Sequence, residues 1–127
     1  MASTRAHHRQ PVWLDDVVEG NYTAAASYLS LAYKPRRVAS LVKSLRASAI
    51  THFAAKDIFR ASGLSLLGIS NSHVEKDRKK IRQGAALSPV LLVRDRRHGK
   101  VVIADGYHRV CAVYGFDEDA SIPCKIA

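Results

Sequence analysis

The sequence predicts an α+β domain in which helices pack on a small mixed β-sheet, with an added helical hairpin near the N-terminus. The chain has 127 residues, the usual size of one domain. Its composition, 47% hydrophobic and 24% charged residues, is typical of a globular protein. Helical patterns dominate the first two thirds of the chain, whereas short apolar segments separated by turns dominate the last third.

The first segment, residues 1–20, is predicted to be a flexible tail. Pro11 interrupts regular structure there, and Trp13 is an isolated aromatic residue that could dock on the domain. Residues 21–127 are predicted to fold as one domain.

Residues 21–48 are predicted to form the helical hairpin. Asn21 or Thr23 can cap its first helix, and Pro35 opens the second at the first-turn position that proline favours. The second helix has one apolar face, made by Val38, Leu41, Val42 and Leu45. Its other face is basic and carries Arg36, Arg37, Lys43 and Arg46.

In the middle of the chain, the residue pattern predicts a short strand at residues 50–53 and a brief helix at residues 56–61 that ends at Gly63. Residues 64–69 are apolar, and their periodicity does not separate a strand from a buried turn. A charged helix then runs to about Gln83. Asn71 or Ser72 can cap this helix, Gly84 ends it, and Val74 and Ile81 form a thin apolar stripe.

Three further segments predict strands, namely residues 89–93, 101–104 and 121–127. A charged turn joins the first two. Pro123 suggests that the last strand lies at an edge or begins there. Between the second and third strands, Gly106 opens a helix that we expect to end at Gly115.

The chain is strongly basic, with 20 Lys and Arg, 11 Asp and Glu and a net charge of +9. The excess lies in residues 34–100, which hold 16 basic residues against four acidic ones. This balance favours a polyanionic partner, such as a nucleotide or nucleic acid, although a solvated basic surface gives the same composition.

Several classes of protein are excluded by what the sequence lacks. No apolar stretch is long enough to span a membrane and the start is polar, so we expect a cytoplasmic protein with no membrane partner. Cys111 and Cys124 are too few for a disulfide scaffold, and we expect reduced, buried thiols. His52 and His98 have no second ligand at a suitable spacing, so no zinc site is predicted.

One group of neighbouring residues predicts an anion-binding site. It is the strand-to-helix turn at Asp105, Gly106, Tyr107, His108 and Arg109. The first turn of a helix has unpaired N–H groups and a positive dipole end, so it stabilises an anion. Gly106 allows close approach of a phosphate, and Arg109 and His108 can donate to its oxygens. In the simpler alternative, Gly106 only makes the turn, Asp105 caps the helix, and His108 and Arg109 are solvated.

The order of the elements in residues 50–127 resembles that of the ParB/sulfiredoxin-like superfamily. The pieces that carry the resemblance are the polar helix ending at Gly84, the strand beginning Ser88-Pro89-Val90-Leu91, the strand at 101–104, the turn and helix Gly106-Tyr107-His108-Arg109-Val110-Cys111-Ala112, and the strand Ile122-Pro123-Cys124-Lys125-Ile126. In this family the Gly-x-x-Arg turn contacts nucleotide phosphates. The resemblance therefore implies that role for Gly106 to Arg109 and a basic residue near the nucleotide at His73.

The sequence also departs from the family pattern. Sulfiredoxins have the reactive cysteine of a Gly-Cys-His-Arg turn where this chain has Tyr107, so a sulfiredoxin-type repair reaction is not expected. No helix-turn-helix segment follows the family-like core, so specific centromere binding is not expected either. Tyr107 could stack on a base or belong to the core.

We therefore expect a domain that binds the phosphates of a nucleotide or a nucleic acid. If it is an enzyme, we expect phosphoryl transfer or phosphodiester hydrolysis, with a nucleoside triphosphate and Mg²⁺ as cofactors. Asp105 is the candidate metal ligand and Asp105 and Glu75 are the candidate catalytic acids, although an acid in the first turn of a helix is expected for Glu75 on dipole grounds alone. Lys76, Lys79 and Lys80 could line the edge of the site.

A non-catalytic DNA-binding or regulatory module is the alternative, with the basic helices at 34–48 and 73–83 following a phosphate backbone. A further possibility is a domain that only binds a partner, through Trp13 and the Ala-rich helix. The sequence does not predict the oligomeric state.

Overall fold

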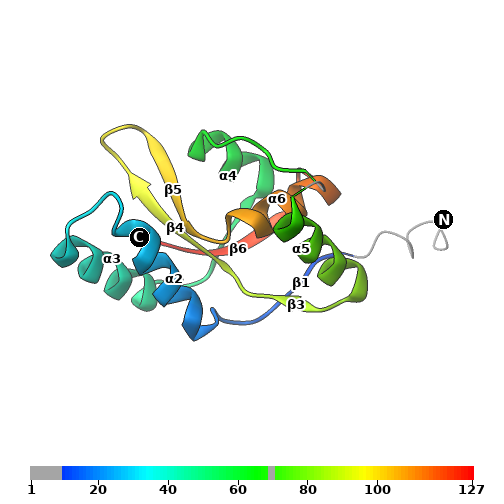
Figure 1. Cartoon of the computed structure of the whole chain (residues 1–127), viewed down its shortest axis with the longest axis horizontal. Coiled ribbons are helices and arrows are strands. Elements are labelled where there is room, and N and C mark those ends of the chain that lie inside the picture. Colours follow the sequence, from blue (N-terminus) through cyan, green and yellow to red (C-terminus); the bar gives the residue numbers. More distant parts are fainter. Residues whose placement is uncertain (1–9, 69–70) are drawn as a thin grey trace.

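The computed structural model describes residues 10–68 and 71–127, and it places a four-stranded sheet between two groups of helices (Figure 1). The helices are α2 (Glu19–Leu29), α3 (Pro35–Ala47), α4 (Ala55–Ser62), α5 (Ser72–Gln83) and α6 (Tyr107–Phe116). The strands are β1 (Val12–Trp13), β2 (Thr51–Ala54), β3 (Ala86–Leu87), β4 (Val90–Asp95), β5 (Lys100–Asp105) and β6 (Ser121–Ile126).

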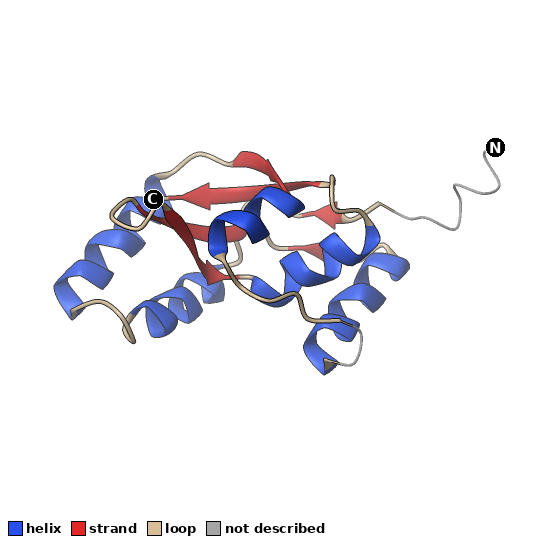
Figure 2. Cartoon of the chain, turned by 90° about the horizontal axis from the view of Figure 1, so that it is seen from above, coloured by secondary structure: helices blue, strands red, loops and turns tan. Residues whose placement is uncertain are grey.

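The main sheet has the strand order β2-β6-β4-β5, and its strands lie side by side in Figure 2. β4 runs antiparallel to β5 and parallel to β6, while β6 runs antiparallel to β2. The sheet is therefore mixed, which confirms the predicted α+β class. A separate two-stranded sheet joins β1 to β3 in parallel.

The inner strand β4 has apolar side chains on both faces. Because successive residues of a strand point to opposite faces, Val90 and Leu92 enter one core cluster while Leu91 and Val93 enter another. All four residues have an exposed fraction of 1% or less. A continuous apolar run of this kind is expected for a strand that is covered on both sides.

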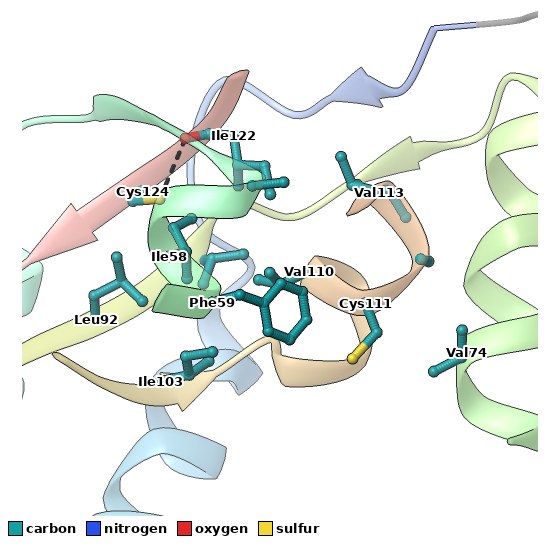
Figure 3. Packing of buried hydrophobic residues seen from close by; sticks show 14 of the residues in the cluster. Ile58, Phe59, Val74, Leu92, Ile103, Val110, Cys111, Val113, Ile122 and Cys124 are labelled. Carbon is teal, nitrogen blue, oxygen red and sulfur yellow. Dashed lines mark hydrogen bonds between the residues drawn. The ribbon is translucent and has the colours of Figure 1, made fainter. Parts of the chain in front are cut away.

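Each face of the sheet has its own helices. The first cluster packs β4, β5 and β6 against α4, α5 and α6, and Figure 3 shows Phe59, Val110 and Cys111 within it. The second cluster packs the opposite face of β4 against α2 and α3, with Leu29 and Leu45 among its buried members. The predicted helical hairpin is therefore an essential layer of the domain.

The chain before residue 21 differs from the predicted flexible tail. Residues 1–9 lie outside the described part, but Val12 and Trp13 pair with β3, and Leu14 N–H donates to the Leu87 carbonyl at 2.8 Å. Trp13 also packs against the first core cluster. Residues 12–14 are therefore held by a strand far along the chain, and Trp13 docks on the domain, as considered from the sequence.

The start of α2 is also misplaced in the prediction. The helix begins at Glu19, and no side chain of its own segment caps it. Ser88 Oγ instead accepts hydrogen bonds from the Val18 N–H at 3.0 Å and from Asn21 Nδ2 at 2.7 Å. The group that satisfies this helix terminus comes from the loop before β4, so local sequence gave no sign of it.

Two boundaries in the last third also differ from the prediction. β6 is an inner strand, which corrects the edge position suggested by Pro123. The pairing of β6 with β4 starts one residue later, at Cys124, so Pro123 precedes the stretch paired with β4 and lies opposite His52 of β2. The helix α6 continues through Gly115 to Phe116. Residues 64–68 form neither helix nor strand, and the rest of that predicted segment lies outside the described residues.

Several local signals are confirmed. Pro35 opens α3, and Gly63 and Gly84 end α4 and α5 in left-handed conformations. Asn71 caps α5 by accepting from two backbone N–H groups. Both cysteines are buried, and burial raises the pKa of Cys124 to about 12. Within residues 10–68 and 71–127, no helix has the length and apolar character that crossing a bilayer requires.

Lys125 joins three segments on the α2–α3 side of the sheet. Its side chain is buried, and Nζ donates to the Tyr22 hydroxyl at 3.0 Å and to the Arg46 carbonyl at 3.2 Å. It also lies 3.3 Å from the Asp16 carboxylate. The Arg46 carbonyl is one of the last four of α3, which have no partner within the helix, so Lys125 satisfies the end of that helix.

We predict that Lys125→Met lowers the free energy of unfolding by about 1.5–3 kcal/mol, because the Tyr22 hydroxyl and the Arg46 carbonyl lose a charged donor. Urea denaturation followed by circular dichroism measures the change. Lys43→Met is the control, because Lys43 is exposed and has no salt bridge among the described residues. Equal stability of the two variants would contradict the proposed role of Lys125.

Candidate functional site

The chain turns from β5 into α6 at Gly106, whose φ of 109° lies in the left-handed region. A β-carbon on this residue would lie 2.9 Å from Val90 Cγ2 and 2.7 Å from Arg109 Nη2. Glycine is therefore required both by the backbone conformation and by the close packing of β4. No side chain caps α6, so its first N–H groups have no side-chain acceptor.

Asp105 and Arg109 form an ion pair across this turn. Arg109 Nη2 lies 2.8 Å from Asp105 Oδ2, and both side chains are only 16% exposed. Arg109 Nε is buried and has no hydrogen-bond partner among the described residues. The Asp105 carboxylate is thus held by Arg109 and does not cap α6, and the guanidinium is fixed over Gly106 at the start of the helix.

The helix α5 brings a second set of side chains to the same place. His73, Lys76, Asp77 and Lys80 recur at the spacing that places residues on one helix face. Val74 and Ile81 anchor α5 in the core. His73 meets His108 of α6, with 4.8 Å between ring centroids and 36° between ring planes.

These two segments line a cavity of about 210 Å³. The lining residues are His73, Lys76, Asp77, Lys80, Asp105, Gly106, Tyr107, His108 and Arg109. Every residue of the predicted site except Glu75 and the edge residue Lys79 is therefore brought together here. We call this the α5–α6 cavity.

Glu75 lies on a different side of α5. Its carboxylate is 2.9 Å from Arg82 Nη2 and 3.9 Å from Arg78 Nε, and it does not line the cavity. The structure thus gives Glu75 ion-pair partners along its own helix. Lys79, another predicted edge residue, does not line the cavity either.

Asp77 lines the cavity but was not among the predicted residues. Its position four residues after His73 is the signal that could have identified it, because that spacing puts both side chains on one helix face.

Tyr107 is engaged by the protein itself. Its hydroxyl donates to the Ser65 carbonyl, and its ring packs against the first core cluster. Burial raises the pKa of this phenol. Of the two roles considered for Tyr107, the contacts fit the structural one, since this hydrogen bond ties the loop at residues 64–68 to the start of α6.

The electrostatics of the cavity are dominated by cations. Lys76 and Lys80 are exposed and have no ion pair with a described residue, whereas the charge of Arg109 is matched by Asp105. Burial, and then the neighbouring His73, lowers the pKa of His108 below its usual 6.5, although Asp77 opposes the change. His108 is therefore largely neutral at pH 7 in the free protein.

A metal ion would find few protein ligands at this site. Within the described part of the chain, no group of three or more His, Cys, Asp or Glu side chains is arranged to hold one. The Asp105 carboxylate already binds Arg109. Mg²⁺ in this cavity would therefore depend mainly on the oxygens of a bound phosphate and on water.

Comparisons of this chain with protein-family models, with curated proteins and with solved structures find no match. What the α5–α6 cavity could bind must therefore be inferred from the residues that line it.

We predict that Gly106→Ala lowers the free energy of unfolding by about 2 kcal/mol or more, because the added methyl group forces a left-handed residue against Val90. Urea denaturation without any ligand measures this. Gly20→Ala is the matched control, since nothing lies within 4 Å of the position of its added β-carbon. Wild-type stability of Gly106→Ala would contradict the described turn.

Proposed function

We propose that the α5–α6 cavity binds a phosphate group of a nucleotide or of a nucleic acid. The observation that carries this proposal is the meeting of two lysines of α5, Lys76 and Lys80, with the uncapped first turn of α6. Backbone N–H groups, the helix dipole and ammonium groups then converge on one small volume. Each of them stabilises an anion.

The ion pairs leave the cavity with a positive balance. Asp105 and Arg109 neutralise each other, which leaves Lys76 and Lys80 against the single carboxylate of Asp77. Arg109 Nε is buried near the start of α6 and has no hydrogen-bond partner among the described residues. A dianionic phosphate therefore gains more from this site than a neutral ligand does.

The size of the cavity limits what can enter it. A volume of about 210 Å³ suits one or two phosphate groups and is below the range of sites that enclose a whole small molecule. Tyr107 is tied to Ser65, so its ring is not free to sandwich a base. A base and its sugar would therefore lie outside the cavity. The resemblance of the Gly-x-x-Arg turn to that of ParB-like domains supports the same class of ligand, a nucleoside triphosphate with Mg²⁺ included.

Binding is better supported than catalysis. A hydrolase or phosphotransferase of this kind needs a carboxylate free to accept a proton or a metal ion. Asp105 is held by Arg109, and Glu75 is outside the cavity. Catalysis through Asp105 would require its ion pair to open.

The alternative of one continuous DNA-binding surface made by the two basic helices has less support. α3 and α5 lie at opposite ends of the molecule in Figure 1 and belong to different core clusters. Arg46 of α3 is also paired with Glu19 at 2.6 Å. Each basic region therefore has to be considered as a separate surface.

We predict that pyrophosphate and nucleoside triphosphates, with or without Mg²⁺, raise the Tm of the wild-type protein by several degrees, since a ligand of the folded state stabilises it. Lys76→Gln/Lys80→Gln removes most of this shift because the unpaired cations of the cavity are lost. Thermal unfolding against a panel of these anions is the measurement. The matched control is Lys43→Gln/Lys79→Gln, which removes two charges outside the cavity. The proposal fails if no anion shifts the Tm, or if both double variants respond equally.

We also predict that sulfate binds more tightly as the pH falls from 8 to about 5.5, by roughly threefold or more. The pKa of His108 is lowered in the free protein, so the side chain is neutral above pH 6.5, and a bound anion favours its protonated form. Sulfate keeps its charge over this range, so the change reports the protein. Isothermal titration at several pH values measures it, with His108→Gln and His73→Gln separating the two imidazoles. An affinity independent of pH would rule out contact between the anion and His108.

A further inference from the structure

A second cavity lies at the other end of the molecule, where α3 and the turn between β4 and β5 are found (Figure 1). It has a volume of about 550 Å³, larger than the α5–α6 cavity. Its lining residues are Tyr33, Arg37, Leu41, Ser44, Arg94, Asp95, Arg96, Arg97 and Ala127. We call it the arginine cleft.

Four arginines from α3, β4 and the turn after β4 line this cleft. Arg37 comes from the first turn of α3, Arg94 from the end of β4, and Arg96 and Arg97 from the turn that follows. All four are exposed, and none forms a salt bridge with a described residue. Residues 1–9, 69 and 70 contain no Asp or Glu, so no acidic side chain elsewhere in the chain neutralises these arginines.

The only acidic side chain that lines the cleft is engaged elsewhere. Asp95 Oδ2 lies 2.8 Å from His98 Nδ1, and Asp95 Oδ1 accepts from the His98 N–H at 3.3 Å. The hydrogen bond to His98 is also the main reason that the pKa of Asp95 is lowered. This contact fixes the turn and engages the Asp95 carboxylate with His98, and Asp95 forms no salt bridge with Arg96 or Arg97.

The start of α3 adds to the positive potential of the cleft. Its first turn holds no acidic residue, and no side chain caps it. The positive end of the helix dipole is therefore uncompensated on the side that carries Arg37. Tyr33, which precedes this helix, packs in part on the second core cluster and is half-buried, so the rest of its side chain lines the cleft.

We infer that the arginine cleft binds a single-stranded nucleic acid, with its arginines on successive phosphates and Tyr33 against a base. Guanidinium groups bind phosphate oxygens in a bidentate manner, and an aromatic ring beside a basic groove is the arrangement that holds single strands without reading their sequence. The site is separate from the α5–α6 cavity and does not depend on it.

The composition of the cleft favours a nucleic acid over an acidic protein. Protein interfaces have an apolar centre, whereas the apolar side chains here are Leu41, which is only 4% exposed, and a single alanine. The cleft therefore offers charge and one aromatic ring, which are the two features that a phosphodiester chain with unstacked bases requires.

The test uses the full chain and a fluorescein-labelled oligodeoxythymidylate of roughly 12 nucleotides, followed by fluorescence anisotropy between about 50 and 200 mM salt. We expect Arg94→Gln/Arg96→Gln/Arg97→Gln to bind at least roughly tenfold more weakly and to reduce the slope of log affinity against log salt by about 2, since each lost phosphate contact on a single strand removes about 0.7. Tyr33→Leu is expected to weaken binding roughly tenfold while the salt slope stays unchanged.

The matched control is Lys43→Gln/Arg60→Gln/Lys79→Gln, which removes the same charge from exposed positions outside both cavities. Circular dichroism and thermal unfolding check that all variants fold. Near wild-type binding by the control, together with loss in the arginine variant, supports the inference. Equal loss in both triple variants, or an unchanged affinity in the arginine variant, overturns it.

Two further arms of the experiment distinguish the arginine cleft from a different binding surface and from a different class of partner. Lys76→Gln/Lys80→Gln removes the cations of the α5–α6 cavity, and we expect it to weaken oligonucleotide binding much less than Arg94→Gln/Arg96→Gln/Arg97→Gln does. Complete loss in this variant would place the strand at the other cavity and overturn the inference without affecting the proposed function. Competition by polyglutamate as effective as that by unlabelled oligonucleotide would assign the cleft to an acidic protein and overturn the inference as well.

Discussion

The turn at Gly106 connects the main sheet to the α5–α6 cavity, and the geometry of the candidate site depends on it. Its left-handed backbone lets β5 end and α6 begin within one residue, and its missing side chain lets Val90 of β4 and the guanidinium of Arg109 approach. Because α6 starts directly at the sheet, its uncapped first turn faces α5. The Asp105–Arg109 ion pair then fixes the one arginine that lines the cavity among the described residues and leaves the lysines of α5 to set its charge.

The two-sided sheet explains why anion-binding features occur at two separate places. β4 carries apolar side chains to both faces, so helices cover the sheet on both sides and the strand ends extend toward opposite ends of the molecule. One end meets α5 and α6, and the other continues into the turn beside α3. The excess of Lys and Arg over Asp and Glu in residues 34–100 is thus divided between the α5–α6 cavity and the arginine cleft.

What the sequence predicted well was local. Gly84 ends α5 because a left-handed glycine suits a helix terminus, and Asn71 caps it by bonding to its own first turn. What it missed depends on distant contacts: β1 exists because β3 pairs with it, and Ser88 satisfies the start of α2 from far along the chain. From the sequence we predicted only a strand at residues 89–93; the continuous apolar run Val90–Val93 is the signal that could have indicated burial on both faces, and with it a covering role for the helical hairpin.

The site shows the same division. The turn at Gly106 was predicted from adjacent residues. The ion pair between Asp105 and Arg109 was not predicted, although the two residues are four apart, a spacing at which helical side chains meet.

Titration of the isotope-labelled protein with pyrophosphate, followed by amide NMR, tests most directly whether the start of α6 binds phosphate. The largest shifts are expected at the N–H groups of Tyr107, His108 and Arg109, with smaller ones along the face of α5 that lines the cavity. Unmoved amides at the start of α6, with binding detected elsewhere or not at all, would contradict the account.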